Sequence, residues 1–265
     1  MKPRRNRLRG YNLLFVLPFL IFMVVMVIIP LSMLFYYAFF MDGSFTFEYF
    51  RIIFTDGNTL RLMWQSVWIA LLGCLICFVI AYPIAYGLAF AGFKRKTTIL
   101  LLFTLPLWIN LLLRSVALHQ VFTLLGFEQG LTTLLIAIAL NFVTIMILPI
   151  YLVLSNINKK YLEASADLGA PPHRTFWRIT LPLSTPGIVA GFILVFTPAA
   201  SSYFLAVRFG NYSTRMFGET LDRLLETGHF AFGSVISIMF LGIVVLGVLS
   251  LNFLTRKGNK RGGLW

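Results

Sequence analysis

Long apolar stretches dominate this chain and limit what it can fold into. A helix needs about 20 apolar residues to cross the ~30 Å hydrocarbon core of a bilayer. Six stretches reach that length: residues 11–39, 64–91, 98–120, 131–154, 186–207 and 231–254. Only 12% of the residues are charged, too few to cover the surface of a water-soluble domain. The sequence therefore predicts an all-α, polytopic membrane protein with six transmembrane helices.

The first stretch follows a basic leader, as the core of a secretory signal peptide does. It runs from about Tyr11 to Phe40, well beyond the roughly 7–15 residues of a signal core, and no A-x-A cleavage site follows it. We therefore expect an uncleaved first span, with Pro18 and Pro30 as kinks or ends.

The basic residues lie mainly in four segments. Sixteen of the 22 Lys and Arg residues fall within residues 1–10, 94–96, 155–185 and 255–265. The positive-inside rule places these segments in the cytoplasm. We expect a basic cytoplasmic N-terminus (1–10), a six-helix domain (11–254) with a cytoplasmic loop at 155–185, and a basic cytoplasmic C-terminus (255–265). The net charge of +13 gathers at span ends rather than on one basic face, so nucleic acid is not an expected partner.

The loop between spans four and five contains a charged segment, YLEASADLGAPPHRTFWRITLP, at residues 161–182. Its four charged side chains are Glu163, Asp167, Arg174 and Arg178. Four charges at the bilayer centre would cost about 10 kcal/mol, so this segment lies outside the lipid.

Residue types within this loop predict two short helices at an angle. Asn158 suits the cap of a helix over residues 159–168, and Gly169 suits the left-handed position that ends it. Two prolines then prevent continuation, and a second helix is expected over residues 173–179. The aromatic residues Phe176 and Trp177 need burial against the protein's own spans or against a partner.

This elbow resembles the EAA signature, roughly E-A-A-x3-G-x9-I-x-L-P, of permease subunits in bacterial binding-protein-dependent ABC importers. Ser165 stands where the signature has its second alanine, a small residue for a small one. The resemblance implies a type I ABC importer permease fold and a coupling helix that docks in a groove of a cytoplasmic ATPase. The residues implied in that contact are Glu163, Ala164, Ser165, Asp167, Gly169, Leu181 and Pro182.

Two further segments, LPLWINLLLRSVAL at residues 105–118 and TPAASSYF at residues 197–204, are similar to the type B permeases of spermidine/putrescine importers. This likeness implies a bacterial inner-membrane protein that works with a second permease subunit, an external solute-binding protein and a dimeric ATPase. It implies a polyamine substrate, with another solute such as iron, thiamine or an anion as the alternative. ATP and magnesium would bind the ATPase, and this chain would bind no cofactor.

Motifs for catalysis are missing from the sequence. It contains no G-x4-G-K-[ST] nucleotide loop, no nucleophile elbow and no helical histidine pair. Cys74 and Cys77 lie inside an apolar run without neighbouring histidines, so we interpret them as small apolar side chains rather than a metal or redox site. We expect a chain with no catalytic or metal-binding residues, and thus not an enzyme.

Polar and aromatic residues inside the spans are candidates to line a solute path. They are Trp108, Asn110, Arg114, Asn141, Thr144, Ser201, Ser202 and Tyr203. Arg114 either snorkels to the outer interface or serves the path. The small residues 198–202 favour tight helix packing, a broken pore-lining helix facing a second permease, or both.

The spans contain no Asp or Glu. A cationic substrate would therefore depend on aromatic faces or on carboxylates of a partner. An ion-coupled secondary transporter is a weaker alternative, because such proteins usually use intramembrane acids.

Overall fold

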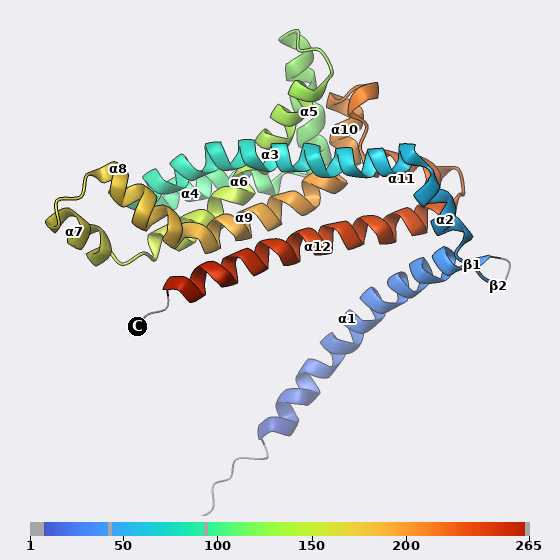
Figure 1. Cartoon of the computed structure of the whole chain (residues 1–265), viewed down its shortest axis with the longest axis horizontal. Coiled ribbons are helices and arrows are strands. Elements are labelled where there is room, and N and C mark those ends of the chain that lie inside the picture. Colours follow the sequence, from blue (N-terminus) through green and yellow to red (C-terminus); the bar gives the residue numbers. More distant parts are fainter. Residues whose placement is uncertain (1–7, 42–43, 93–94, 263–265) are drawn as a thin grey trace, which may run out of the picture. The chain divides into compact units, whose positions relative to one another are not determined.

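The computed structural model describes residues 8–41, 44–92 and 95–262 (Figure 1). Its α-helices are α1 (Leu8–Phe39), α2 (Glu48–Thr55), α3 (Gly57–Phe90), α4 (Lys96–Thr104), α5 (Leu111–Leu124), α6 (Leu131–Ser155), α7 (Lys160–Asp167), α8 (Pro172–Thr175), α9 (Leu181–Ser201), α10 (Tyr203–Phe209), α11 (Phe217–Glu226) and α12 (Phe230–Gly262). Leu105–Trp108 and Tyr212–Thr214 are 3-10 turns, and Phe176–Thr180 is a π-helical turn. Two short strands, β1 (Phe40–Met41) and β2 (Ser44–Phe45), pair antiparallel. Most of the basic N-terminal segment and the end of the C-terminal one lie outside the described residues.

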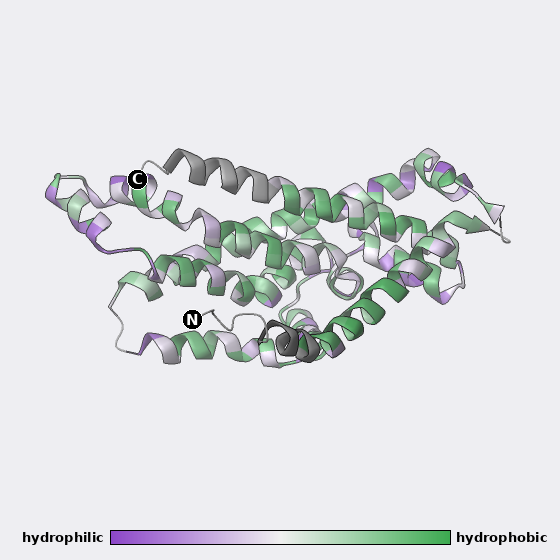
Figure 2. Cartoon of the chain, turned by 90° about the horizontal axis from the view of Figure 1, so that it is seen from below, coloured by the Kyte–Doolittle hydropathy of each residue, from purple (hydrophilic) through white to green (hydrophobic). Residues whose placement is uncertain are grey.

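Five helical runs of the described chain are long and apolar enough to cross a membrane. They are Val16–Phe39, Gly57–Phe90, Leu131–Ser155, Pro172–Ser201 and Phe230–Ser250. A sixth candidate is the pair Lys96–Trp108 and Leu111–Leu124, which is bent by 94°. Figure 2 shows hydrophobic residues along the long helices and hydrophilic ones at their connections. Counted as one span, the bent pair completes the six predicted spans, with a sharp bend inside the predicted stretch of residues 98–120.

The bend in the third span has a local cause. Pro106 lies in the 3-10 turn and has no N–H to continue a helical hydrogen-bond ladder. Ile109 then adopts an extended conformation, with φ −84° and ψ 134°. Asn110 restarts the helix, because its side chain accepts a hydrogen bond from the N–H of Leu112 at 2.8 Å. The apolar run continues through this bend, so hydropathy alone predicts a single span.

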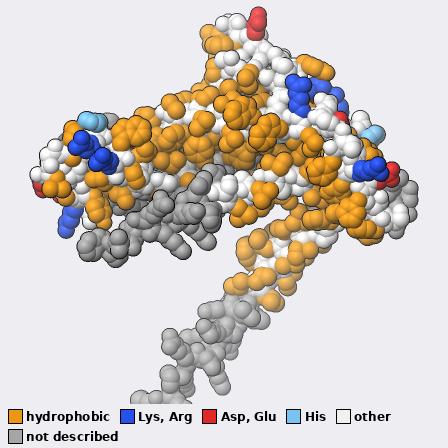
Figure 3. Space-filling view, in the orientation of Figure 1, with side chains coloured by type: hydrophobic (Ala, Val, Ile, Leu, Met, Phe, Trp, Pro, Cys, Tyr) orange, Lys and Arg blue, Asp and Glu red, His pale blue; other side chains and the backbone are white. Residues whose placement is uncertain are grey.

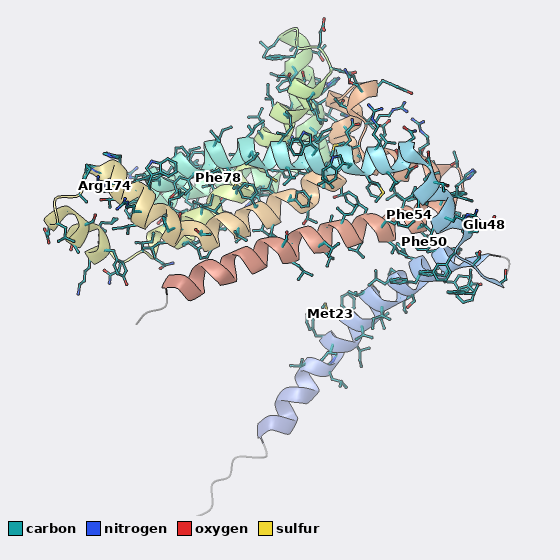
Figure 4. All side chains as sticks on the ribbon, viewed as in Figure 1. Met23, Glu48, Phe50, Phe54, Phe78 and Arg174 are labelled. Carbon is teal, nitrogen blue, oxygen red and sulfur yellow. The ribbon has the colours of Figure 1, made fainter. Side chains whose placement is uncertain are left out.

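The chain divides into two compact units, one of residues 1–57 with 224–241 and the other of residues 58–223 with 242–265. In the first unit, the β1–β2 hairpin follows α1 and precedes α2. Phe39 stacks on Phe45 and Phe50, with ring centroids 5.7 and 4.9 Å apart. Phe50 and the exposed Glu48 are labelled on α2 in Figure 4. These aromatic contacts hold the hairpin against α2.

The second unit is built around α6, which packs closely against α9 (Figure 1). Gly187 and Gly191 of α9 form a G-x-x-x-G pair on the face that meets α6. A Cβ at Gly187 would lie 2.7 Å from the carbonyl oxygen of Pro149, and one at Gly191 would lie 3.1 Å from Cγ of Met146. Small residues at these positions let the two backbones approach, as in other packed membrane helices.

Helix α3 contacts α6 through small side chains. A Cβ at Gly73 would lie 2.6 Å from Cγ2 of Ile138. Cys74 and Cys77 are both buried and unbridged, and the thiol of Cys77 makes a weak 3.8 Å contact with the carbonyl of Ala139. The cysteines therefore serve as small packing residues, as the sequence predicts.

Candidate functional site

The charged loop forms a helical elbow of α7 and α8 at one end of the second unit (Figure 1). The side chain of Asn158 accepts a hydrogen bond from the N–H of Lys160 at 3.1 Å, as expected of a capping residue, although Lys159 occupies the N-cap position of the helix. Gly169 follows α7 with a φ of +74°, which confirms the left-handed residue. Helix α7 covers Lys160–Asp167, one residue shorter at each end than predicted.

A hydrogen bond between two hydroxyl groups joins α7 and α8, the two arms of the elbow. Ser165 of α7 is only 7% exposed, and its Oγ lies 2.8 Å from Oγ1 of Thr175 at the end of α8. The N–H of Ala170 also donates to the carbonyl of Ser165 at 3.1 Å. The hydroxyls of Ser165 and Thr175 are thus hydrogen-bond partners of each other, and neither is left unsatisfied beside the tight turn at Gly169.

The second arm of the elbow differs from the prediction of a separate short helix over residues 173–179. Helix α8, the π-helical turn Phe176–Thr180 and α9 form one continuous run, Pro172–Ser201. Pro172 stands in the first turn, where a proline is tolerated. Pro182 has no N–H to donate, and the wider π-helical turn accommodates that gap. The second arm is thus a rigid extension of span five.

Aromatic side chains fix this extension to α3. The ring of Phe176 lies 5.7 Å from each of the rings of Tyr82 and Tyr86, in edge-on contacts. The hydroxyl of Tyr82 hydrogen-bonds to Ser184 Oγ of α9 at 3.0 Å, in a buried site. The sequence does not predict the contacts of Tyr82 and Tyr86 with Phe176, since an isolated tyrosine inside an apolar run does not reveal which side chains it meets in the fold.

The outer face of the elbow is exposed. Glu163, Ala164, Asp167 and Gly169 are all exposed, and Leu168 is 87% exposed. Lys, Arg and His side chains gather at this end of the unit in Figure 3, and Arg174 of α8 is labelled there in Figure 4. Of the residues that the signature implies, Ser165 faces inward, and Leu181 and Pro182 lie at the start of α9 rather than on α7.

Arg114 is tied to the protein rather than to the membrane interface. Its Nε and Nη2 donate to the side chain and the backbone carbonyl of Asn141, both at 2.8 Å. Its Nη1 donates to the carbonyl of Pro106 at 2.7 Å. The guanidinium forms a three-point clamp that joins the bend of the third span to α6, a role that neither the snorkelling nor the path interpretation includes.

Span five is interrupted at Ser202, so it ends earlier than the predicted residue 207. Ser202 has φ −76° and ψ 78°, and α10 begins at the next residue. The hydroxyl of Ser202 donates to the carbonyl of Pro198, and that of Ser201 donates to Thr197 at 3.0 Å. A Cβ at Gly218 of α11 would lie 2.7 Å from the carbonyl oxygen of Ser201, so α11 covers the break closely. These contacts confirm a broken helix; whether it lines a pore stays a prediction.

The remaining path candidates divide between these two interruptions. Trp108 is 84% exposed on the bend, and Asn110 serves as a helix cap. Tyr203 begins α10, and Thr144 is buried in α6. Within the described part of the chain, no hydrogen bond joins the Arg114 clamp to the Ser201–Tyr203 break. The same part of the chain contains no group of three His, Cys, Asp or Glu residues that could hold a metal ion.

Comparison with known proteins decides the family. The family described as "Binding-protein-dependent transport system inner membrane component" matches residues 3–261. The chain belongs to this family. The spermidine/putrescine transport system permease protein PotB of Haemophilus influenzae is 29% identical, over 98% of this chain and 97% of that protein. This membership confirms that the chain is a multi-pass transport permease, and the family is not one of enzymes.

Solved structures of this family's fold are also similar. A bacterial ABC transporter involved in the import of the acidic polysaccharide alginate matches 94% of this chain and 96% of its own, with a TM-score of 0.74 at 15% identity. The alginate transporter in complex with a periplasmic protein bound to an alginate pentasaccharide has a TM-score of 0.67, over 94% of this chain and 95% of its own, at 16% identity. These matches confirm the type I ABC importer permease fold.

Proposed function

We propose that this permease subunit serves the uptake of a polyamine, spermidine or putrescine. It works with a second permease subunit, an external solute-binding protein and a cytoplasmic ATPase dimer that binds ATP and magnesium. The near full-length similarity to a spermidine/putrescine permease supports the substrate class. The alginate transporter, whose structure is in complex with a periplasmic protein bound to an alginate pentasaccharide, supports the kind of external partner.

The elbow is the docking element for the ATPase in this proposal. The observation that carries it is an exposed face of α7 on a rigid support: Glu163, Ala164 and Asp167 are exposed, while Ser165 is locked inward. Phe176 packs between Tyr82 and Tyr86, so a push on α7 passes through α8 into α3 and α9. With the elbow in the cytoplasm, both termini lie there too.

The solute path in this proposal runs between this subunit and the second permease. The chain leaves the helical conformation at Ile109 and at Ser202, and membranes tolerate such non-helical backbone only against protein or water. Arg114 keeps its positive charge, because its acceptors on Asn141 and Pro106 are neutral, but these hydrogen bonds fix its guanidinium between α6 and the bend of the third span. Since the spans contain no carboxylate, the charge that attracts a polyamine comes from a partner subunit.

Uptake into vesicles tests the proposal. The complete importer is reconstituted with ATP inside and the binding protein outside, and radiolabelled spermidine and putrescine are supplied. We expect accumulation that needs both ATP and the binding protein. Uptake of radiolabelled thiamine or iron, without uptake of either polyamine, would contradict the polyamine assignment and identify a different substrate. Uptake driven by an ion gradient in the absence of ATP would contradict the importer assignment.

A further inference from the structure

A polar hollow lies at the opposite end of α3 from the elbow. It has a volume of about 230 Å³ and is lined mainly by Asn58, Arg61, Gln65, Tyr212, Ser213 and Arg215. Arg61 and Gln65 come from the first turns of α3, whereas the other side is the 3-10 turn Tyr212–Thr214 and the residue that follows it. In Figure 3, Lys and Arg side chains gather at this end of the second unit as well.

Hydrogen bonds hold the two walls of this hollow together. Gln65 Nε2 of α3 donates to the carbonyl of Ser213 at 2.5 Å. Asn211 fixes the turn by accepting from the N–H of Ser213 at 3.1 Å. The guanidinium carbon of Arg215 lies 4.4 Å from the ring centroid of Tyr212. The hollow is therefore preformed, and Arg215 is oriented before any ligand arrives.

The hollow has more positive than negative charge. Within the described chain, Arg61 makes no ion pair. Glu219 lies 3.4 Å from Nε of Arg215 and 3.7 Å from Nη2 of Arg223, so one carboxylate is shared between two arginines. Two guanidinium groups line one hollow, and the acid that contacts one of them, Glu219, is shared with Arg223, so the hollow suits an anion with several oxygens, such as a phosphate.

The depth of the site points to lipid as the source of that phosphate. Trp64 and Trp68 are 66% and 55% exposed, and they line a second hollow of about 430 Å³ together with Arg61 and Gln65. Spacings of three and seven residues put Arg61, Trp64 and Trp68 on one face of α3. Tryptophan favours the headgroup level of a bilayer, and Arg61 lies only ~10 Å along the helix from Trp68.

We propose that this end of α3 binds an anionic phospholipid. The phosphate of the lipid lies between Arg61 and Arg215, the glycerol region passes Gln65, and an acyl chain lies along Trp64 and Trp68. Phosphatidylglycerol has this chemistry. A lipid bound here holds the outer ends of α3 and of the Tyr212–Thr214 turn at a fixed depth in the membrane. This lipid site is independent of which solute the importer transports.

Quenching of tryptophan fluorescence tests this site directly. The full chain is prepared with Trp108→Phe, Trp177→Phe and Trp265→Phe, so that only Trp64 and Trp68 report. It is placed in liposomes with equal small fractions of either brominated phosphatidylglycerol or brominated phosphatidylcholine. We expect stronger quenching by the phosphatidylglycerol, because the site enriches it next to the two tryptophans. Equal quenching by both lipids would overturn the proposal.

Charge variants assign the preference to the hollow. The pair Arg61→Gln and Arg215→Gln should abolish the excess quenching, whereas Arg61→Lys should keep most of it. Arg51→Gln changes an exposed arginine of α2 that does not line the hollow; it is the matched control and should keep the excess fully. Excess quenching that survives the double change overturns the proposal. Loss of the excess when inorganic phosphate is added would show a soluble-anion site instead. Absence of a lipid preference, with weaker attachment of an external binding protein to the double variant, would show a protein-docking site.

Discussion

The hydroxyl of Ser165 on α7 lies 2.8 Å from the hydroxyl of Thr175 on α8, and this bond closes the angle of the elbow. The family signature has alanine at this position, which can only pack against its neighbours. The serine in this chain also forms a hydrogen bond with Thr175. Docking of α7 on an ATPase requires a fixed orientation of its exposed face, and the hydroxyl pair provides part of that orientation.

Removing the hydroxyl should weaken the elbow without destroying it. Ser165→Ala loses one hydrogen bond, worth about 0.5–1.5 kcal/mol, and leaves no bulky group behind. We expect ATP-dependent uptake to remain, with a small fall in the thermal unfolding temperature of the complex. Ser165→Leu forces a large side chain into a site that is 7% exposed, and it should abolish uptake. Equal uptake by both variants would show that the packing between α7 and α8 is irrelevant.

The elbow was the part of the structure most open to prediction, because its shape is set by local residue types. Asn158 as a cap and Gly169 as a left-handed residue follow from intrinsic preferences that act within one turn. The continuation of α8 into α9 was missed, since the effect of Pro182 depends on whether the chain takes a wider turn at Phe176–Thr180.

Replacement of Arg114 should destabilise the second unit. Arg114→Lys offers a single ammonium group for acceptors on Asn141 and Pro106 that a planar guanidinium reaches together. Each buried acceptor left without a partner costs about 1–3 kcal/mol. We expect a lower unfolding temperature for Arg114→Lys and for Asn141→Leu, and a double variant less destabilised than the sum of the two. Additive effects in this double-mutant cycle would show that Arg114 and Asn141 do not interact, and would contradict the clamp.

The clamp illustrates why the interior of the membrane domain was harder to predict. Hydropathy predicts only how deep in the bilayer Arg114 lies. It does not identify the hydrogen-bond partner, Asn141, which lies 27 residues later on another helix. Only tertiary packing decides between snorkelling and pairing. Pro106 and Asn110 are residue types that can interrupt a helix, yet the apolar run around them predicts one span and does not reveal the 94° bend.

The glycine contact between α9 and α6 should not accept a side chain. Gly187→Leu places its Cβ 2.7 Å from the carbonyl of Pro149, and separating the helices costs at least about 1–3 kcal/mol. We expect loss of monodisperse protein after detergent extraction. Gly87→Leu on α3 is the control, because nothing lies within 4 Å of its added Cβ. A normal yield of Gly187→Leu would contradict the observed packing of α6 on α9.

Trp108 should matter for transport rather than for folding. Its side chain is 84% exposed, so Trp108→Ala removes little packing within this subunit. If the ring contacts the solute path, loss of about 1.4 kcal/mol of interaction would slow uptake about tenfold. The measurement is the initial uptake rate together with recovery of the assembled importer. Leu124→Ala, equally exposed at the end of α5, is the control. Unchanged kinetics for Trp108→Ala would remove this residue from the path.

Site-specific photo-crosslinking from Ala164 is the most direct test of the elbow as the ATPase contact. A photoreactive residue at Ala164 is exposed on α7, and one at Leu124, which is 86% exposed at the end of α5, serves as the comparison. In membranes that contain the complete importer, we expect Ala164 to crosslink to the ATPase subunit and Leu124 to give no such product. Crosslinks from Ala164 only to the permease's own helices, or to the external binding protein, would contradict the proposed role of α7.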